Sequence, residues 1–176
     1  MNISQGLAFT KKYINNWRSK EKKNSIIMNK SIHYIDLLVY LFGKPIKINN
    51  NLSNHANTGK PYDTNIIQFE FKKKIFANIF VSYSTPLNYE MQFILTNSIV
   101  NLRDERLSII YPRDKFNKNG FFERPKEKIL LNIDNFYERS LENSMKVFLK
   151  TVNKKKYFEK NSIISSYNSN MLSVEI

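Results

Sequence analysis

The chain has 176 residues, 41% of them apolar and 14% aromatic, which is enough material for one buried core. It contains no cysteine, so disulfides, thiolate nucleophiles and thiolate metal sites are excluded. Its longest apolar run, 37–42, is far shorter than the ~20 residues that span a bilayer, and its N-terminus has no hydrophobic leader, so the expected location is cytoplasmic.

Residues 31–45 predict a helix with two different faces. Apolar residues recur at the spacing of a buried face: Ile35, Leu38, Val39 and Phe42. His33, Asp36 and Tyr40 follow at i, i+3 and i+7 and form a polar stripe beside that face. Gly43 supplies the positive φ that ends a helix, and Pro45 prevents its continuation.

This polar stripe has two interpretations. It is either a solvated face with a structural hydrogen bond between His33 and Asp36, or part of a catalytic acid-base system. An imidazole can exchange a proton near neutral pH, and a carboxylate one turn away can orient it. Spacing alone does not decide between them.

The segment 13–18, Tyr-Ile-Asn-Asn-Trp-Arg, and the block 28–43 around the helix together resemble the Gfo/Idh/MocA oxidoreductases, whose second domain carries a His-x-x-Asp helix. The resemblance continues at Asp63, which opens the pattern Asp-Thr-Asn-Ile-Ile-Gln-Phe-Glu-Phe, and at 75–83. Only the block 13–43 is specific, because many antiparallel sheets share the alternation of the later strands.

The resemblance implies a two-domain enzyme in which a Rossmann domain binds NAD or NADP and an α/β domain shapes the substrate pocket. Residues 1–12 look like the first strand of that second domain. The chain has four glycines, no Gly-x-Gly-x-x-Gly and no Glu-Lys-Pro, so we expect it to bind no cofactor by itself. Two histidines are also too few for a convincing metal site.

By resemblance, His33 is the acid-base at the sugar hydroxyl whose carbon gives up hydride. Asn29 occupies the position where the family often has a supporting aspartate, and an amide supports an imidazolium less well. Asp36 either orients His33 or has a structural role. These three are the candidate catalytic residues.

Tyr13, Trp17 and Arg18 are the candidate substrate-binding residues. An indole face suits a sugar ring, and a guanidinium suits a carboxylate or phosphate. The alternative for Trp17 and Arg18 is a packed tryptophan and a surface arginine.

The remaining elements predict a mainly antiparallel sheet. Two hairpins are expected, the first pairing 65–71 with 75–83 and the second pairing 89–95 with 98–103, before a strand at 106–111. A long loop over 113–126 leads to a short strand at 127–133. The fold class is therefore α+β, an open and mainly antiparallel sheet packed against helices.

Asp134 is the expected N-cap of a helix whose buried line is Tyr137, Leu141, Met145, Phe148 and Val152. Residues 166–176 resemble the opening of the family's closing helix. We therefore expect a single substrate-binding domain over 1–176, truncated at both ends. A truncated or split reading frame, a trimmed chain, or a subunit whose partner is encoded separately would each explain this.

The net charge of +13 suggests a competing function, nucleic-acid binding. Its lysines lie scattered at turns and ends, so no specific nucleic acid is expected. The first hypothesis is a substrate domain of a sugar or nucleotide-sugar oxidoreductase, inert without a Rossmann partner in cis or in trans. The second is a non-catalytic binding module that forms homo-oligomers through its sheet.

Overall fold

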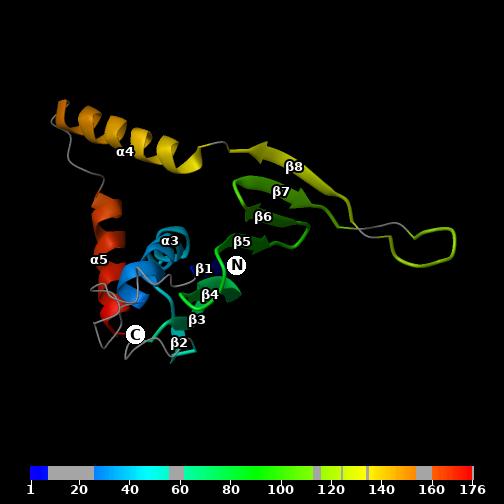
Figure 1. The fold of residues 1–176 in the computed structure, drawn as a ribbon, viewed down its shortest axis with the longest axis horizontal. Helices are drawn as coiled ribbons and strands as arrows, with labels where there is room; N and C mark the ends of the chain where they lie inside the picture. The colour runs from blue at the N-terminus through cyan, green and yellow to red at the C-terminus, as the bar shows by residue number, and fades with distance from the viewer. Residues whose placement is uncertain are drawn as a thin grey trace.

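The computed structural model describes residues 1–7, 26–55, 62–112, 116–123, 125–133, 135–153 and 160–175. Within these ranges, eight strands form one sheet in the order β2-β3-β4-β1-β5-β6-β7-β8 (Figure 1). The strands are β1 (Asn2–Gly6), β2 (Lys47–Ser53), β3 (Thr64–Phe71), β4 (Ile75–Ser82), β5 (Asn88–Ile94), β6 (Ile99–Arg103), β7 (Arg106–Ile110) and β8 (Glu127–Asn132).

Strand β1 joins the two halves of this sheet. It pairs parallel to β4, with Ile3 opposite Ile79, and antiparallel to β5, with Ile3 opposite Met91. The other neighbouring strands are antiparallel. The predicted α+β class and the mainly antiparallel sheet are therefore confirmed, with one parallel pair at the centre.

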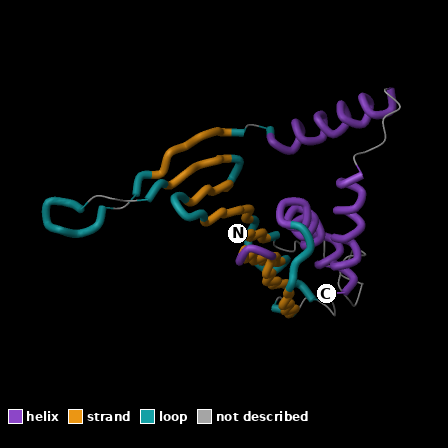
Figure 2. Tube along the Cα trace, turned by 180° about the vertical axis from the view of Figure 1, so that it is seen from behind, coloured by secondary structure: helices purple, strands orange, loops and turns teal. Residues whose placement is uncertain are grey.

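The predicted helix at 31–45 is confirmed as α3 (Ile32–Phe42), which a short π-helix, η1 (Ile27–Ser31), precedes directly. Gly43 follows α3 with φ 79°, so it ends the helix as expected. Helix α5 (Lys160–Glu175) starts before the 166 expected from the sequence and lies beside α3 in both views (Figures 1 and 2).

The core lies between α3 and the central strands. Ile35 and Leu38 of α3 are fully buried, as are Ile67 on β3 and Ile79 on β4. The aromatic ring of Phe42 packs on Phe71, with ring centroids 5.4 Å apart. The apolar face predicted for this helix is therefore the face that the sheet buries.

Two turns use residues that rarely take positive φ. The turn between β3 and β4, η2 (Lys72–Lys74), has φ of 62° at Lys73 and 58° at Lys74. The β6–β7 turn has φ of 46° at Asp104 and 61° at Glu105, the pattern of a tight hairpin turn. Both hairpins therefore form without the glycine that such a backbone conformation favours.

Helix α4 (Phe136–Asn153) departs from the prediction in its burial. Its expected buried line is exposed, from 50% at Phe148 to 67% at Tyr137. The helix stands apart from the sheet and has no broad contact with another described element (Figure 1). Its sequence is amphipathic, but amphipathicity needs a second surface to produce burial. The expected N-cap, Asp134, lies outside the described residues.

Candidate functional site

Helix α3 packs against the core with its apolar face and carries the polar stripe beside that face. His33 and Tyr40 are exposed, whereas Asp36 is half-buried. Tyr34 and Ile35, which flank this stripe, are buried. The helix is therefore a fixed support that leaves the imidazole of His33 open to solvent or to a ligand.

The stripe borders an open depression of about 440 Å³ between α3 and β5. Its lining residues come from these two elements: His33, Tyr34, Asp36, Leu37, Tyr40, Tyr89 and Met91. Phenol, imidazole and thioether groups thus share one surface. Such a mixture of apolar walls and a few polar groups suits a ligand with both ring faces and hydroxyls.

Tyr34 and Tyr89 form the floor of the depression. Their ring centroids are 6.5 Å apart and the rings are tilted by 33°. Burial raises the pKa of Tyr34 well above its usual range, and the nearby Tyr89 raises it further. Burial likewise raises the pKa of Tyr89. Both phenols are therefore neutral at physiological pH and able to donate a hydrogen bond.

Asp36 is engaged by the neighbouring helix. Ser169 of α5, which is 1% exposed, donates from Oγ to Oδ1 of Asp36 at 2.5 Å. This contact links α3 to α5. One carboxylate oxygen can still accept a hydrogen bond from elsewhere.

Asn29 lies in the π-helix, one turn before His33. Its Nδ2 is buried and has no hydrogen-bond partner among the described residues. A buried amide without a partner is uncommon in folded proteins. The three candidate catalytic residues thus lie on one continuous helical segment, whereas the candidate substrate residues Tyr13, Trp17 and Arg18 fall outside the described ranges.

Several residues of this site were not predicted. Tyr89 and Met91 come from a strand far along the chain from α3. The alternation of β5 indicates only that the two side chains share a face of the sheet, and the fold shows that this face meets α3. Ser169 sits on a helix that carries no strong periodic signal. Neither strand register nor helix contact is readable from spacing, so these neighbours required the tertiary fold.

The described part of the chain does not fit a dinucleotide cofactor. A pyrophosphate needs a glycine-rich turn that leads into a free helix N-terminus. The N-terminus of α3 is continuous with η1, and the two described glycines with positive φ, Gly43 and Gly120, lie after a helix and within a loop. Nor do the described residues bring together three or more His, Asp or Glu side chains as a metal would require.

The face of the sheet away from α3 carries a row of amide side chains. In register across the strands lie Asn49, Gln68, Asn78, Asn2, Gln92 and Asn101. Four of these bond in sequence: Asn78 Nδ2 donates to Asn2 at 2.9 Å, Asn2 to Gln92 at 3.4 Å, and Gln92 to Asn101 at 3.1 Å. The row is uncharged and polar.

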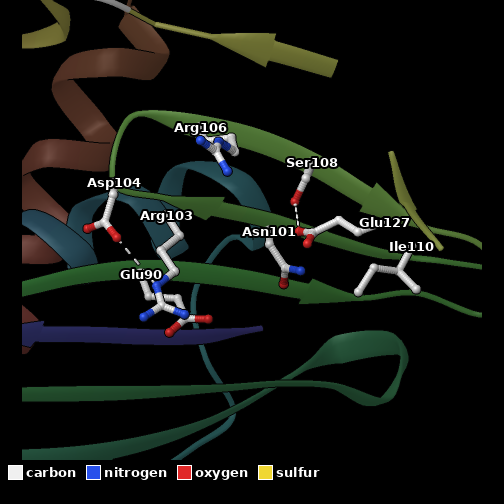
Figure 3. A pocket seen from close by; sticks show the side chains of 8 residues that line it. All are labelled: Glu90, Asn101, Arg103, Asp104, Arg106, Ser108, Ile110 and Glu127. Carbon is white, nitrogen blue, oxygen red and sulfur yellow. Dashed lines mark hydrogen bonds and ion pairs between the residues drawn. The ribbon is translucent and has the colours of Figure 1, made fainter. Parts of the chain in front are cut away.

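At its β8 end the row opens into a charged hollow of about 440 Å³ (Figure 3). Glu90 and Arg103 are cross-strand partners there, and Arg103 Nε lies 3.4 Å from Asp104. Ser108 donates a short hydrogen bond to Glu127. The hollow therefore carries charges of both signs.

Among the described residues, no helix is long and apolar enough to cross a membrane. A comparison with curated proteins finds no match. Solved structures of oxidoreductases do match. The matches cover nearly all of this chain, which spans about half the length of those proteins.

The UDP-N-acetylglucosamine 3-dehydrogenase of Acidithiobacillus ferrooxidans matches with a TM-score of 0.75 and 13% identity, over 99% of this chain and 52% of that one. A levoglucosan dehydrogenase in complex with NADH and L-sorbose matches with a TM-score of 0.67 and 12% identity, over 96% and 52%. An oxidoreductase from Thermotoga maritima matches with a TM-score of 0.66 and 15% identity, over 98% and 49%. At such identities these likenesses establish the fold.

The sequence itself carries the assignment further than the fold does. Residues 4–101, more than half of the chain, match the model of the GFO/IDH/MocA C-terminal domain. That stretch includes most of β1, the helix that bears His33, and the strand that lines the depression. The chain therefore belongs to the Gfo/Idh/MocA C-terminal domain family.

Proposed function

We propose that this chain is the substrate-binding domain of an NAD(P)-dependent oxidoreductase that acts on a sugar, a nucleotide sugar or a related polyol. The cofactor would be held by a Rossmann domain, present in cis or in trans. Family membership over 4–101 supports the proposal, as does the fit to about half of two-domain dehydrogenases. By itself the chain would form one half of the active site.

The exposure of His33 carries this proposal. Its imidazole stands at the rim of the depression, while the residues around it fix α3 in the core. In that position the imidazole is free to accept the proton of a substrate hydroxyl. The floor formed by Tyr34 and Tyr89 would contact the substrate ring, and their neutral phenols would donate to its oxygens.

The other candidates have supporting roles in this proposal. The carboxylate of Asp36, held by Ser169, would fix α3 rather than exchange protons. Asn29, one turn before His33, would support the imidazole with its amide. Tyr13, Trp17 and Arg18 remain the candidates for binding the rest of the substrate.

The decisive experiment pairs the chain with its Rossmann domain and follows nicotinamide reduction against a panel of UDP-sugars, free sugars and polyols. Replacing His33 by Ala should abolish turnover while leaving folding intact. His55→Ala is the matched control, because His55 is the other histidine and its exposed ring bonds to Ser53 at the end of β2, away from the depression. Unchanged turnover in His33→Ala would remove His33 from the mechanism.

Calorimetry on the isolated chain tests the domain assignment separately. We expect no saturable binding of NAD(H) or NADP(H), because the described residues lack a pyrophosphate cradle. Weak binding that disappears with added salt would report only the charge of +13. Micromolar binding that persists in salt would contradict the proposal.

The amide row favours a second function that is compatible with the first, homo-oligomerisation through the open sheet face. An uncharged, hydrogen-bonding row can pair with its own copy across a twofold axis. Light scattering on the chain should give a dimer, and Asn101→Lys should give a monomer because it introduces charge into the row. Asn143→Lys on α4 adds the same charge away from the sheet and should leave the dimer intact.

A further inference from the structure

The start of α3 is attached to the sheet by a buried hydrogen bond. Ser31 Oγ donates to Oδ1 of Asn65 at 2.8 Å, and both residues are 0% exposed. Asn65 lies on β3, and its Nδ2 donates in turn to Oδ1 of Asn50 on β2 at 2.5 Å. A continuous polar chain therefore connects the helix to two strands.

The attached residue is the one at which the helix changes its winding. Residues Ile27–Ser31 form a π-helix, and the N–H of Ile32 donates to the carbonyl of Ile27, five residues earlier. A π-turn takes up an extra residue, so it rotates the residues before it relative to those after it. Such turns are less favourable than α-helix and persist where neighbouring contacts hold them.

His33 lies two residues after this attachment, and Asn29 lies two residues before it. A second attachment follows three residues beyond His33, where Asp36 accepts from Ser169. The imidazole is thus carried on a segment fixed at both sides, by β3 below and by α5 beside it. Because a π-turn changes the rotation of the helix, the directions of the side chains that follow it depend on the geometry of that turn.

We propose that Ser31 and Asn65 are positioning residues for His33, and that their hydrogen bond holds the π-turn that aims the imidazole into the depression. This inference rests on the proposed role of His33 as the acid-base. Burial of apolar surface does not require these two groups, since any small side chain and any strand former would fill their volumes. Their hydroxyl and carboxamide add direction, because a hydrogen bond fixes angle as well as distance.

Histidine side-chain NMR of the isolated chain gives a direct test, because the chain has only two histidines, His33 and His55. Ser31→Ala should move the ring resonances of His33 and leave those of His55 in place. Ser108→Ala is the matched control: Ser108 is 2% exposed and donates to a side-chain carboxylate, but it lies on β7 away from α3. It should move neither histidine.

Asn65→Thr removes the carboxamide acceptor while keeping a polar residue suited to a strand, and it should move His33 in the same way as Ser31→Ala. It serves as the second variant if Ser31→Ala does not fold. In the enzyme assembled with a Rossmann domain, either variant should lower kcat roughly 10- to 100-fold with little change in KM, as expected for a misplaced catalytic group. Ser31→Thr, which keeps the hydroxyl, should restore most of the lost rate.

His33 resonances that coincide with those of the unmodified chain, in whichever variant folds, would overturn the positioning role. This outcome is independent of activity. If His33 moves but turnover never depends on His33, the positioning role stands and the proposed acid-base function fails. If turnover depends on His33 but its ring resonances do not respond to the Ser31 variant, the acid-base function stands and the positioning role fails.

Discussion

The two halves of the sheet have different surroundings. On the β2-β3-β4-β1 side, α3 covers one face and α5 packs beside α3, and residues such as Ile67 and Val81 are fully buried. On the β6-β7-β8 side, Ile129 and Leu131 remain about half exposed, and α4 stands away from them (Figure 1). The strands of both halves nevertheless contain apolar residues.

This contrast shows that an amphipathic pattern specifies a face and not its partner. The pattern on α3 finds a sheet within the described part of the chain, whereas the pattern on α4 finds none. Folded proteins rarely leave a large, contiguous apolar surface exposed to water. In the proposed function, a second domain would supply the missing surface.

The largest expected effect comes from truncating one leucine in the packed helix α3 and comparing it with one in the exposed helix α4. Leu38→Ala in α3, at 0% exposure, should lower the free energy of unfolding by about 2–5 kcal/mol, because it leaves a cavity. Leu141→Ala in α4, at 54% exposure, should change the stability of the isolated chain by less than about 0.5 kcal/mol. Urea denaturation measures both. Equal losses would mean that α4 is covered in solution.

A second variant probes the seam between the halves. A Cβ added at Gly6, where β1 ends, would lie 2.0 Å from the carbonyl oxygen of Pro86. Gly6→Ala should therefore destabilise the chain by about 1–3 kcal/mol by forcing the backbone apart. Ser4→Ala on the same strand is the control for a simple side-chain change. A stability equal to that of the unmodified chain would show that the seam can open without cost.

The packed half also depends on the contact between its two helices. Ser169→Ala removes the donor to half-buried Asp36 and should cost about 1–2 kcal/mol. Ser166→Ala, on an exposed position of the same helix, should be neutral. Thermal unfolding followed by circular dichroism compares the two. A neutral Ser169→Ala would mean that Asp36 finds another partner and is free for a different role.

The smallest effect at neutral pH is expected from Tyr34→Phe. Burial raises the folded-state pKa of Tyr34 above its unfolded value of about 10. Ionisation of this phenol therefore leaves the free energy of unfolding unchanged below about pH 10 and lowers it as the pH rises further. The variant should match the original chain at neutral pH and lose stability less steeply in alkali. Denaturation midpoints across alkaline pH test this, and identical slopes would contradict the burial of this phenol.

The sequence of α3 was sufficient to predict its C-terminal end and its buried face, but not the π-helix that precedes it. Gly43 and Pro45 act locally, through backbone conformation, and the repeat of Ile35 and Leu38 has the period of a helix. The hairpins of β3 with β4 and of β5 with β6 were also readable, because their strands are close in sequence and alternate. Local geometry depends on neighbouring residues, which a sequence displays directly.

The placement of β1 between β4 and β5 came only from the tertiary structure. The same holds for His33 and Tyr89 lining one depression, and for the hydrogen bond of Ser31 with Asn65. Each joins residues far apart in the chain, and a strand register or a helix rotation selects among many such pairs. The exposure of the apolar stripe on α4 was likewise decided by the tertiary structure. Its period was evident in the sequence, but burial is a property of two surfaces, and only the folded chain shows whether the second one is there.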